Sequence, residues 1–227
     1  MSETDLSRYL RPTEFCDCDH PSLKEFAQTL GSPDQDPIST AVAIFYFVRD
    51  NIKSGMDRFD LKASQTYVKK YGGCVGKSNL QIALLRAAGI PARYAHINMS
   101  KEVLRPLDTF GLSHLAFQKI PPLLPHVVCS VYLKEKWLFA EAAFDKEMFE
   151  MFFAANFSWD INWDGQHDLL VAREFFVGNF SFYDSMDDDF ARNFGALPPL
   201  FLSRPMFSAA NIYSSRLRGR HRRKRTD

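Results

Sequence analysis

The pattern of apolar and polar positions predicts helices in the first half of the chain. Apolar residues fall at helical spacing over Ile38–Ile52, at Ala41, Ile44, Phe45, Val48 and Ile52. A shorter helix is expected over Pro21–Leu30, and an amphipathic helix over Asn79–Ala88. Gly89 and Pro91 follow this third helix, in the order typical of a helix C-terminus.

Strands are predicted after the third helix. Ala92–Ile97 fits a strand, and a later hairpin has strands over Val127–Leu133 and Trp137–Ala140, with its turn at Lys134-Glu135. Phe175–Phe182 fits either a helix or a strand. Because the helices precede the strands and do not alternate with them, the expected fold class is α+β and not a doubly wound sheet.

Length and composition favour one domain. The chain has 227 residues, 46% of them hydrophobic and 21 of them Phe, which is enough for a sizeable core. We expect a single domain over residues 1–212, with its core at about 38–150 and an aromatic-rich extension over 151–212. Within the core, Met99–Leu124 is predicted to be a loop with a short helix.

Charge is unevenly distributed along the chain. Residues 216–227 hold seven basic residues and one acid, a net charge of +6; the whole chain has +1, so the remainder carries −5. We predict that 213–227 is a basic, disordered tail that aids solubility or contacts an acidic partner. No nucleic-acid-binding fold accompanies this tail, so no nucleic-acid partner is expected.

The sequence indicates a cytoplasmic protein with reduced thiols. Met1–Leu10 lacks the apolar run of a signal peptide, and the most apolar helix, near Ala41–Val48, is too short to span a bilayer. Four cysteines without a secretion signal favour free thiols over disulfides. The pattern Cys16-x-Cys18-x-His20 lacks the second ligand pair of a tetrahedral site, so no metal is expected.

Cys74 lies in the most informative local pattern, Tyr71-Gly72-Gly73-Cys74, directly ahead of the third helix. The two glycines permit a tight turn and a close approach to a substrate. The unpaired N–H groups and partial positive charge of a helix start favour the thiolate, which is the nucleophilic form of cysteine. The following Gly76-Lys77-Ser78 suggests a phosphate loop, but Tyr71 stands where that loop requires glycine.

A cysteine nucleophile needs a base, and the base needs an orienting group. His126 stands at the head of the predicted hairpin. If the hairpin turns at Lys134-Glu135, residue 126 pairs with 143, and both Glu141 and Asp145 share the face of His126. Four other histidines are alternative bases: His20, His96, His114 and His167.

Several stretches resemble the transglutaminase-like superfamily. The most specific are Gly73-Cys74 with the helix end over Ala83–Arg93, and His126 followed by Trp137 and Glu141–Asp145. The resemblance spans roughly residues 9–150. It implies a papain-like core in which a cysteine-bearing helix packs on an antiparallel sheet, with Cys74 as nucleophile and His126 as base.

The family pattern leaves the acid open. Many relatives carry an aspartate four residues after the tryptophan, where this chain has Glu141, and bacterial relatives often carry Asn or Asp at the place of Asp145. The candidate oxyanion donors are backbone N–H groups at Gly73-Cys74 and the Gln65 side chain.

The resemblance implies acyl transfer or hydrolysis at an amide or thioester bond, without a cofactor. The substrate expected is a protein, a peptide or an acyl thioester. The family also contains catalytically silent scaffolds, and biosynthetic acyltransferases that take an acyl group from a carrier-protein thioester. Both alternatives stay open; in the second, the basic tail would dock an acidic carrier.

Overall fold

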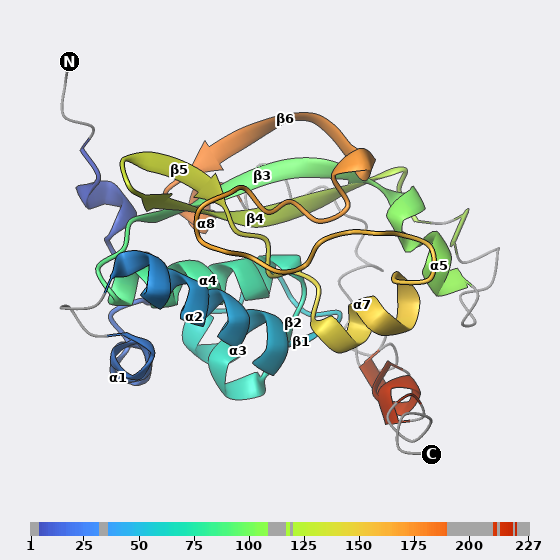
Figure 1. Cartoon of the computed structure of the whole chain (residues 1–227), viewed down its shortest axis with the longest axis horizontal. Coiled ribbons are helices and arrows are strands. Elements are labelled where there is room, and N and C mark those ends of the chain that lie inside the picture. The colour runs from blue at the N-terminus through green and yellow to red at the C-terminus, as the bar shows by residue number, and fades with distance from the viewer. Residues whose placement is uncertain are drawn as a thin grey trace.

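The computed structural model describes residues 5–31, 36–108, 117–118, 120–189, 211–212, 214–219 and 221. In this part of the chain a four-stranded antiparallel sheet packs on one side of helix α4 (Cys74–Ala87) (Figure 1). The other sides of α4 are covered by three helices, α1 (Pro21–Leu30), α2 (Pro37–Asn51) and α3 (Ala63–Lys69). This mixed architecture is the expected α+β class.

Helices α1 and α2 begin at clear sequence signals. The His20 side chain accepts a hydrogen bond from the Ser22 N–H at the start of α1, and the Asp36 carboxylate accepts one from the Ile38 N–H at the start of α2. Proline occupies the first position of each helix, where its missing N–H costs nothing. The predicted bounds of both helices are confirmed to within one residue.

Helix α4 differs from its prediction in two ways. It begins at Cys74 and not at Asn79, because Gly73 is its N-cap and the Lys77 N–H donates to the Gly73 carbonyl over 2.9 Å. It is also not amphipathic, since every residue from Val75 to Arg86 is buried. The polar residues that suggested an exposed face are buried because the sheet and three helices surround α4, and many hydrogen-bond to backbone carbonyls.

The sheet has the strand order β5-β4-β3-β6. Its strands are β3 (Ala92–Ser100), β4 (Leu123–Leu133), β5 (Lys136–Phe139) and β6 (Phe176–Tyr183). The β4–β5 hairpin turns at Lys134 and Glu135 as predicted, and both residues have the positive φ of tight hairpin turns, 46° and 63°. Strand β6 shows that the ambiguous segment Phe175–Phe182 is a strand.

Short elements complete the described structure. Strand β1 (Lys53–Ser54) pairs in parallel with β2 (Tyr71–Gly72), which leads into α4. The others are the 3₁₀ helices Ser7–Tyr9, Lys101–Leu104 and Arg173–Phe175, and the helices α5 (Arg105–Asp108), α7 (Lys146–Phe152) and α8 (Met186–Asp189). Within the described residues, no helix combines the length and apolar character that a bilayer crossing requires.

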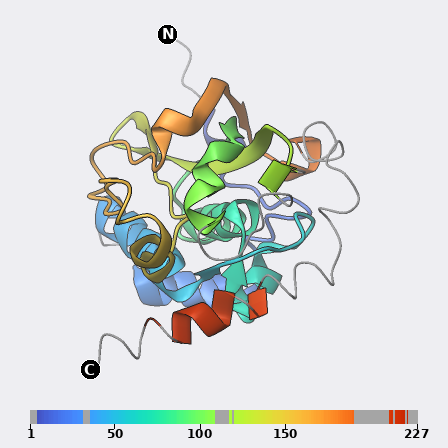
Figure 2. The same ribbon diagram turned by 90° about the vertical axis from the view of Figure 1, so that its right-hand side faces the viewer.

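Part of the segment 213–227, for which a basic tail is predicted, is described by the structure. Residues 214–219 form a helix, called here the C-terminal helix, which lies below α7 in Figure 1 and below α4 in Figure 2. Arg218 on this helix is buried, with 6% of the residue exposed. A dense run of positive charge favours solvation, but Arg218 is stabilised inside the protein by carboxylate partners. Residues 222–227 lie outside the described part.

Candidate active site

Cys74 is held at the start of α4, and Figure 2 looks along that helix. In the β1–β2 pair that leads into it, Ser54 aligns with Gly72, and the Gly55 N–H donates to the Gly72 carbonyl over 3.1 Å. A Cβ on Gly72 would lie 3.3 Å from Cγ2 of Thr66, so glycine permits this close approach. The turn leaves the Cys74 side chain half-buried at the helix N-terminus.

His126 lies on β4 and is buried, with 5% of the residue exposed. Its Nε2 lies 2.8 Å from Oε1 of Glu141. Nδ1 is therefore the ring nitrogen that Glu141 leaves free, and His126 is close enough to Cys74 for the two side chains to shift each other's pKa. Phe176 of β6 lies beside the imidazole, with 5.7 Å between the ring centroids. His126 therefore pairs with Glu141 on one side and lies near the Cys74 thiol.

Glu141 is fixed by the segment that follows α7. Its Oε2 accepts a hydrogen bond of 2.6 Å from the Val171 N–H, and its own N–H donates to the Leu169 carbonyl over 3.2 Å. Strand β5 has already ended, and Ala140 forms an isolated bridge with Leu169. Glu141 is only 2% exposed. Its carboxylate is therefore oriented by a backbone N–H group as well as by His126.

The thiol and the imidazole shift each other's pKa. Burial disfavours the Cys74 thiolate, but the hydrogen bond and charge of His126, together with backbone N–H groups of Val127 and Val75, lower the pKa of Cys74 below its ordinary value. Burial also disfavours the His126 cation, but Glu141 and the Cys74 thiolate raise the pKa of His126 to about 10. Both shifts are in the direction that favours a thiolate beside an imidazolium.

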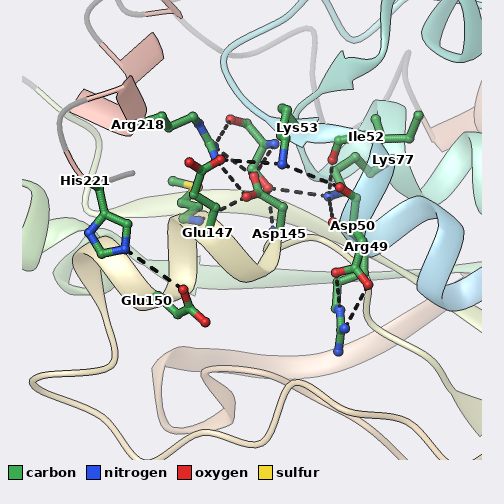
Figure 3. A network of polar contacts seen from close by, with 12 residues as sticks. Arg49, Asp50, Ile52, Lys53, Lys77, Asp145, Glu147, Glu150, Arg218 and His221 are labelled. Atoms are coloured by element: carbon green, nitrogen blue, oxygen red, sulfur yellow. Dashed lines mark hydrogen bonds and ion pairs between the residues drawn. The ribbon is translucent and has the colours of Figure 1, made fainter. Parts of the chain in front are cut away.

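Asp145, the other acid on the predicted face, lies in a separate cluster (Figure 3). The chain leaves the sheet after Ala140, so no strand carries Asp145 toward His126. Its Oδ1 instead accepts the Met148 N–H at the start of α7, and both carboxylate oxygens bind Arg218, at 2.7 and 2.8 Å. Of the two acids that the sequence left open, the structure brings Glu141 to the imidazole.

The Asp145 cluster also shifts pKa values. Burial disfavours the Asp145 carboxylate, but the Arg218 hydrogen bonds and the charge of Lys77 lower the pKa of Asp145 to about 2. Burial lowers the pKa of Lys77 to about 7, although the Asp145 charge opposes this change. Asp145 is therefore a permanent anion at the pH of cells.

Gln65 has a structural role at the start of α3. It is exposed on α3, and its Oε1 accepts a hydrogen bond of 2.9 Å from the Lys62 N–H. This is a capping box, in which a side chain three residues into a helix pairs with the backbone before it. Gly73 directly precedes Cys74 as the N-cap of α4, and the roles of Gln65 and Gly73 as oxyanion donors stay predictions.

The alternative histidines that the structure describes have other surroundings. His20 caps α1, His167 is exposed and pairs with Asp164, and His96 is buried on β3. His114 lies outside the described residues. Of the described histidines, His126 is the one whose side chain lowers the pKa of Cys74.

Sequence reasoning missed two buried cations, Lys77 and Arg218. Lys77 is fully buried, and its Nζ donates to the Ile52 carbonyl at the end of α2 over 2.7 Å (Figure 3). The sequence analysis noted Lys77 within Gly76-Lys77-Ser78. No local sequence pattern indicates that a lysine is buried, so its burial was not predicted. Arg218 lies 73 residues from its partner Asp145, so no sequence spacing could have joined them.

Together, Cys74, His126 and Glu141 can form a nucleophile and move a proton between thiol and imidazole. Backbone N–H groups at the start of α4 point toward the same region. Among the residues that the structure describes, no group of three or more His, Cys, Asp or Glu side chains has an arrangement suited to a metal ion.

Comparison with known proteins gives a family and a fold. Residues 24–142 match the model of the transglutaminase-like superfamily, which is more than half of the chain. No curated protein sequence matches the chain.

Two solved structures are similar. A proposed cysteine protease from Cytophaga hutchinsonii has a TM-score of 0.54 and 20% identity, covering 82% of this chain and 50% of that protein. The chain thus spans about half the length of that relative. A proposed protease from Parabacteroides distasonis has a TM-score of 0.38 and 15% identity, covering 60% of this chain and 25% of that one.

Proposed function

The chain belongs to the transglutaminase-like superfamily, and from this premise we propose that it is an enzyme that breaks or exchanges an amide or thioester bond through Cys74. The observation that carries the proposal is the site formed by Cys74, His126 and Glu141, with 2.8 Å between imidazole and carboxylate. A titratable base between a thiol and a buried acid is what a cysteine nucleophile requires.

The proposed reaction has two steps. The Cys74 thiolate attacks the carbonyl carbon, His126 gives its proton to the leaving amine or thiol, and a thioester forms on Cys74. Water or an amine then attacks the thioester while His126 takes a proton from it, and the Cys74 thiolate leaves. Backbone N–H groups at Gly73-Cys74 would bind the oxyanion in each step.

Glu141 has the role of orienting group in this proposal. It holds Nε2 of His126 and leaves Nδ1 free for the thiol, and it stabilises the imidazolium. We propose a protein or peptide as the substrate. Hydrolysis and transfer share the acyl-enzyme and differ only in the second nucleophile, so one experiment can examine both.

The first test is the reactivity of each cysteine. Wild-type protein is treated with iodoacetamide over a range of pH, and alkylation is followed at each cysteine by peptide mass spectrometry. We expect Cys74 to react at a pH well below the ordinary thiol range. Cys129 is the internal control, because burial raises the pKa of its thiol. If Cys74 reacts no faster than Cys129, the protein is a silent scaffold and the proposal is wrong.

The second test asks for turnover. Casein-derived peptides are incubated with the protein, with and without a fluorescent primary amine, and cleavage, deamidation and amine incorporation are measured. The Cys74→Ala variant should retain the fold and lose all three signals. Equal activity in that variant would assign the reaction to another protein in the preparation or to another site.

A further inference from the structure

We propose that Arg218 and Asp145 are positioning residues for Cys74. They act through strand β1, which lies beside the turn that leads into the thiol. The inference rests on the proposed function, because a nucleophile must exist before its position can matter. It gives a role to a residue of the basic C-terminal segment and to the acid that does not reach His126.

The pair is built as a rigid contact. The Arg218 guanidinium binds Asp145 through two hydrogen bonds, Nη1 to Oδ1 and Nη2 to Oδ2, at 2.7 and 2.8 Å (Figure 3). Nη1 also lies 3.2 Å from Oε2 of Glu147. The side chains of Arg218 and Asp145 are 7% and 0% exposed. A bidentate pair that is withdrawn from water fixes both distance and orientation.

The pair holds the backbone of Ser54 on both sides. Asp145 Oδ2 accepts the Ser54 N–H over 2.6 Å, and Arg218 Nη2 donates to the Ser54 carbonyl over 3.1 Å. The Ser54 hydroxyl accepts the Asp145 N–H and donates to the Ala143 carbonyl, each over 2.8 Å. Ser54 therefore has its peptide groups and its side chain fixed by the same cluster.

Ser54 passes this constraint to the turn before Cys74. It aligns with Gly72 in the β1–β2 pair, and the next N–H along, that of Gly55, donates to the Gly72 carbonyl. Gly73 follows as the N-cap of α4, and a Cβ placed on it would lie 3.4 Å from the Gly55 carbonyl oxygen. Little space separates these segments, so a shift of β1 would move the start of α4.

The C-terminal segment is fastened at a second point, two residues after the end of β1. The Asn211 side chain accepts the Met56 N–H over 2.9 Å and donates to the Met56 carbonyl over 2.7 Å. Ser54 and Met56 are thus held by Arg218 and Asn211, while Ser54 and Gly55 contact Gly72 of β2. Since Asp145 follows Glu141 by four residues, the cluster also connects the segment that bears the acid to the one that bears the thiol.

The test compares Arg218→Ala with Arg216→Ala, its exposed neighbour on the C-terminal helix. Each protein is scored by the rate and pH profile of Cys74 alkylation, by melting temperature, and by rescue with added methylguanidinium. We expect Arg218→Ala to lower the Cys74 rate by about 10²-fold, the order of loss from a small misplacement of a reacting group. Methylguanidinium should restore part of that rate, and Arg216→Ala should match wild type.

The outcomes separate the two proposals. A wild-type Cys74 without enhanced reactivity contradicts the proposed function itself. A reactive wild type with an unchanged Cys74 rate and profile in a folded Arg218→Ala variant, even one that melts earlier, contradicts the positioning role alone. If Arg218→Ala does not fold, Arg218→Lys and Asn211→Ala replace it, and the proposal then requires both to lower the Cys74 rate without unfolding.

Discussion

The carboxylates of Glu141 and Asp145, four residues apart, are buried to a similar degree, but one binds a titratable partner and the other a permanently charged one. Glu141 binds the imidazole of His126 and a backbone N–H. Asp145 binds the guanidinium of Arg218 and the N–H groups of Ser54 and Met148. The first pair can release a proton at accessible pH, and the second cannot, because arginine stays charged.

The comparison shows what each pair is suited to do. A buried pair with a permanently charged partner holds backbone segments in place but moves no proton. A pair built on histidine keeps a proton that can pass to the thiol, at the expense of a weaker constraint. The protein therefore divides two tasks, proton transfer and positioning, between neighbouring acids that the sequence alone could not distinguish.

The largest expected effect comes from breaking the first pair. In Glu141→Gln the amide keeps the size of the side chain but removes the charge that raises the pKa of His126. The pH window in which thiolate and imidazolium coexist should narrow from its alkaline side, and turnover should fall by about 10²-fold or more. Histidine NMR titration measures the fall in the His126 pKa, and alkylation of Cys74 against pH measures the narrower window.

An exposed pair provides the control for Glu141→Gln. His167 lies 2.6 Å from Asp164, with side chains 82% and 50% exposed. Asp164→Asn also removes a carboxylate beside a histidine, but it should leave the Cys74 profile unchanged. If the two variants behave alike, the charge of Glu141 does not control His126.

Much of this architecture could be predicted from the sequence. The hairpin register was predicted from one local signal, the turn at Lys134-Glu135. The structure has this turn and the predicted register, with Ser130 opposite Phe139. The cysteine-bearing helix was also predicted, although its true start at Cys74 was not. Five polar side chains within α4 suggested an exposed face, and only the tertiary structure shows that helices cover it.

The choice between the two acids could not be predicted, for a physical reason. Strand parity placed Glu141 and Asp145 on one face, but parity holds only while a strand continues. The chain leaves the sheet at Ala140, where Leu169 from a distant segment pairs with it. Arg218, which takes Asp145, lies even further along the chain. The partners of Glu141 and Asp145 both depend on long-range contacts that a single sequence does not reveal.

A smaller effect is expected on the free energy of unfolding when each acid, Asp145 or Glu141, is replaced by its amide. Asp145→Asn leaves the buried Arg218 charge without its bidentate partner, with Glu147 still 3.2 Å from Nη1, and loss of one member of such a pair costs about 3–5 kcal/mol. Glu141→Gln should cost about 1 kcal/mol, because His126 can lose its proton and keep a neutral hydrogen bond. Urea unfolding at neutral pH tests the ranking, and equal losses would contradict the distinction between the pairs.

The acid side of the stability profile gives an independent check on Asp145. Its folded pKa of about 2 lies below the ordinary value of 3.8, so its contribution is present above that value and is lost as pH falls toward 2. In Asp145→Asn this part of the loss of stability at acid pH should be missing, as urea unfolding at a series of acid pH values would show.

The smallest effect concerns Lys77, the buried lysine of the Asp145 cluster. Its folded pKa of about 7 lies below the ordinary 10.5, so the unfolded chain binds more protons between these values and stability should rise with pH there. His126 acts in the opposite direction, because its folded pKa of about 10 lies above the ordinary 6.5. The two contributions offset each other, and wild-type stability should change little from neutral to alkaline pH.

Lys77→Met separates the two contributions. Without the lysine, the His126 contribution remains, so stability should fall as pH rises toward 10. Lys24→Met, at an exposed position on α1, should keep the wild-type profile. Thermal unfolding of the three proteins in a series of buffers gives the slopes. A Lys77→Met profile parallel to wild type would mean that the buried lysine holds its proton as firmly as an exposed one, and that burial does not shift it.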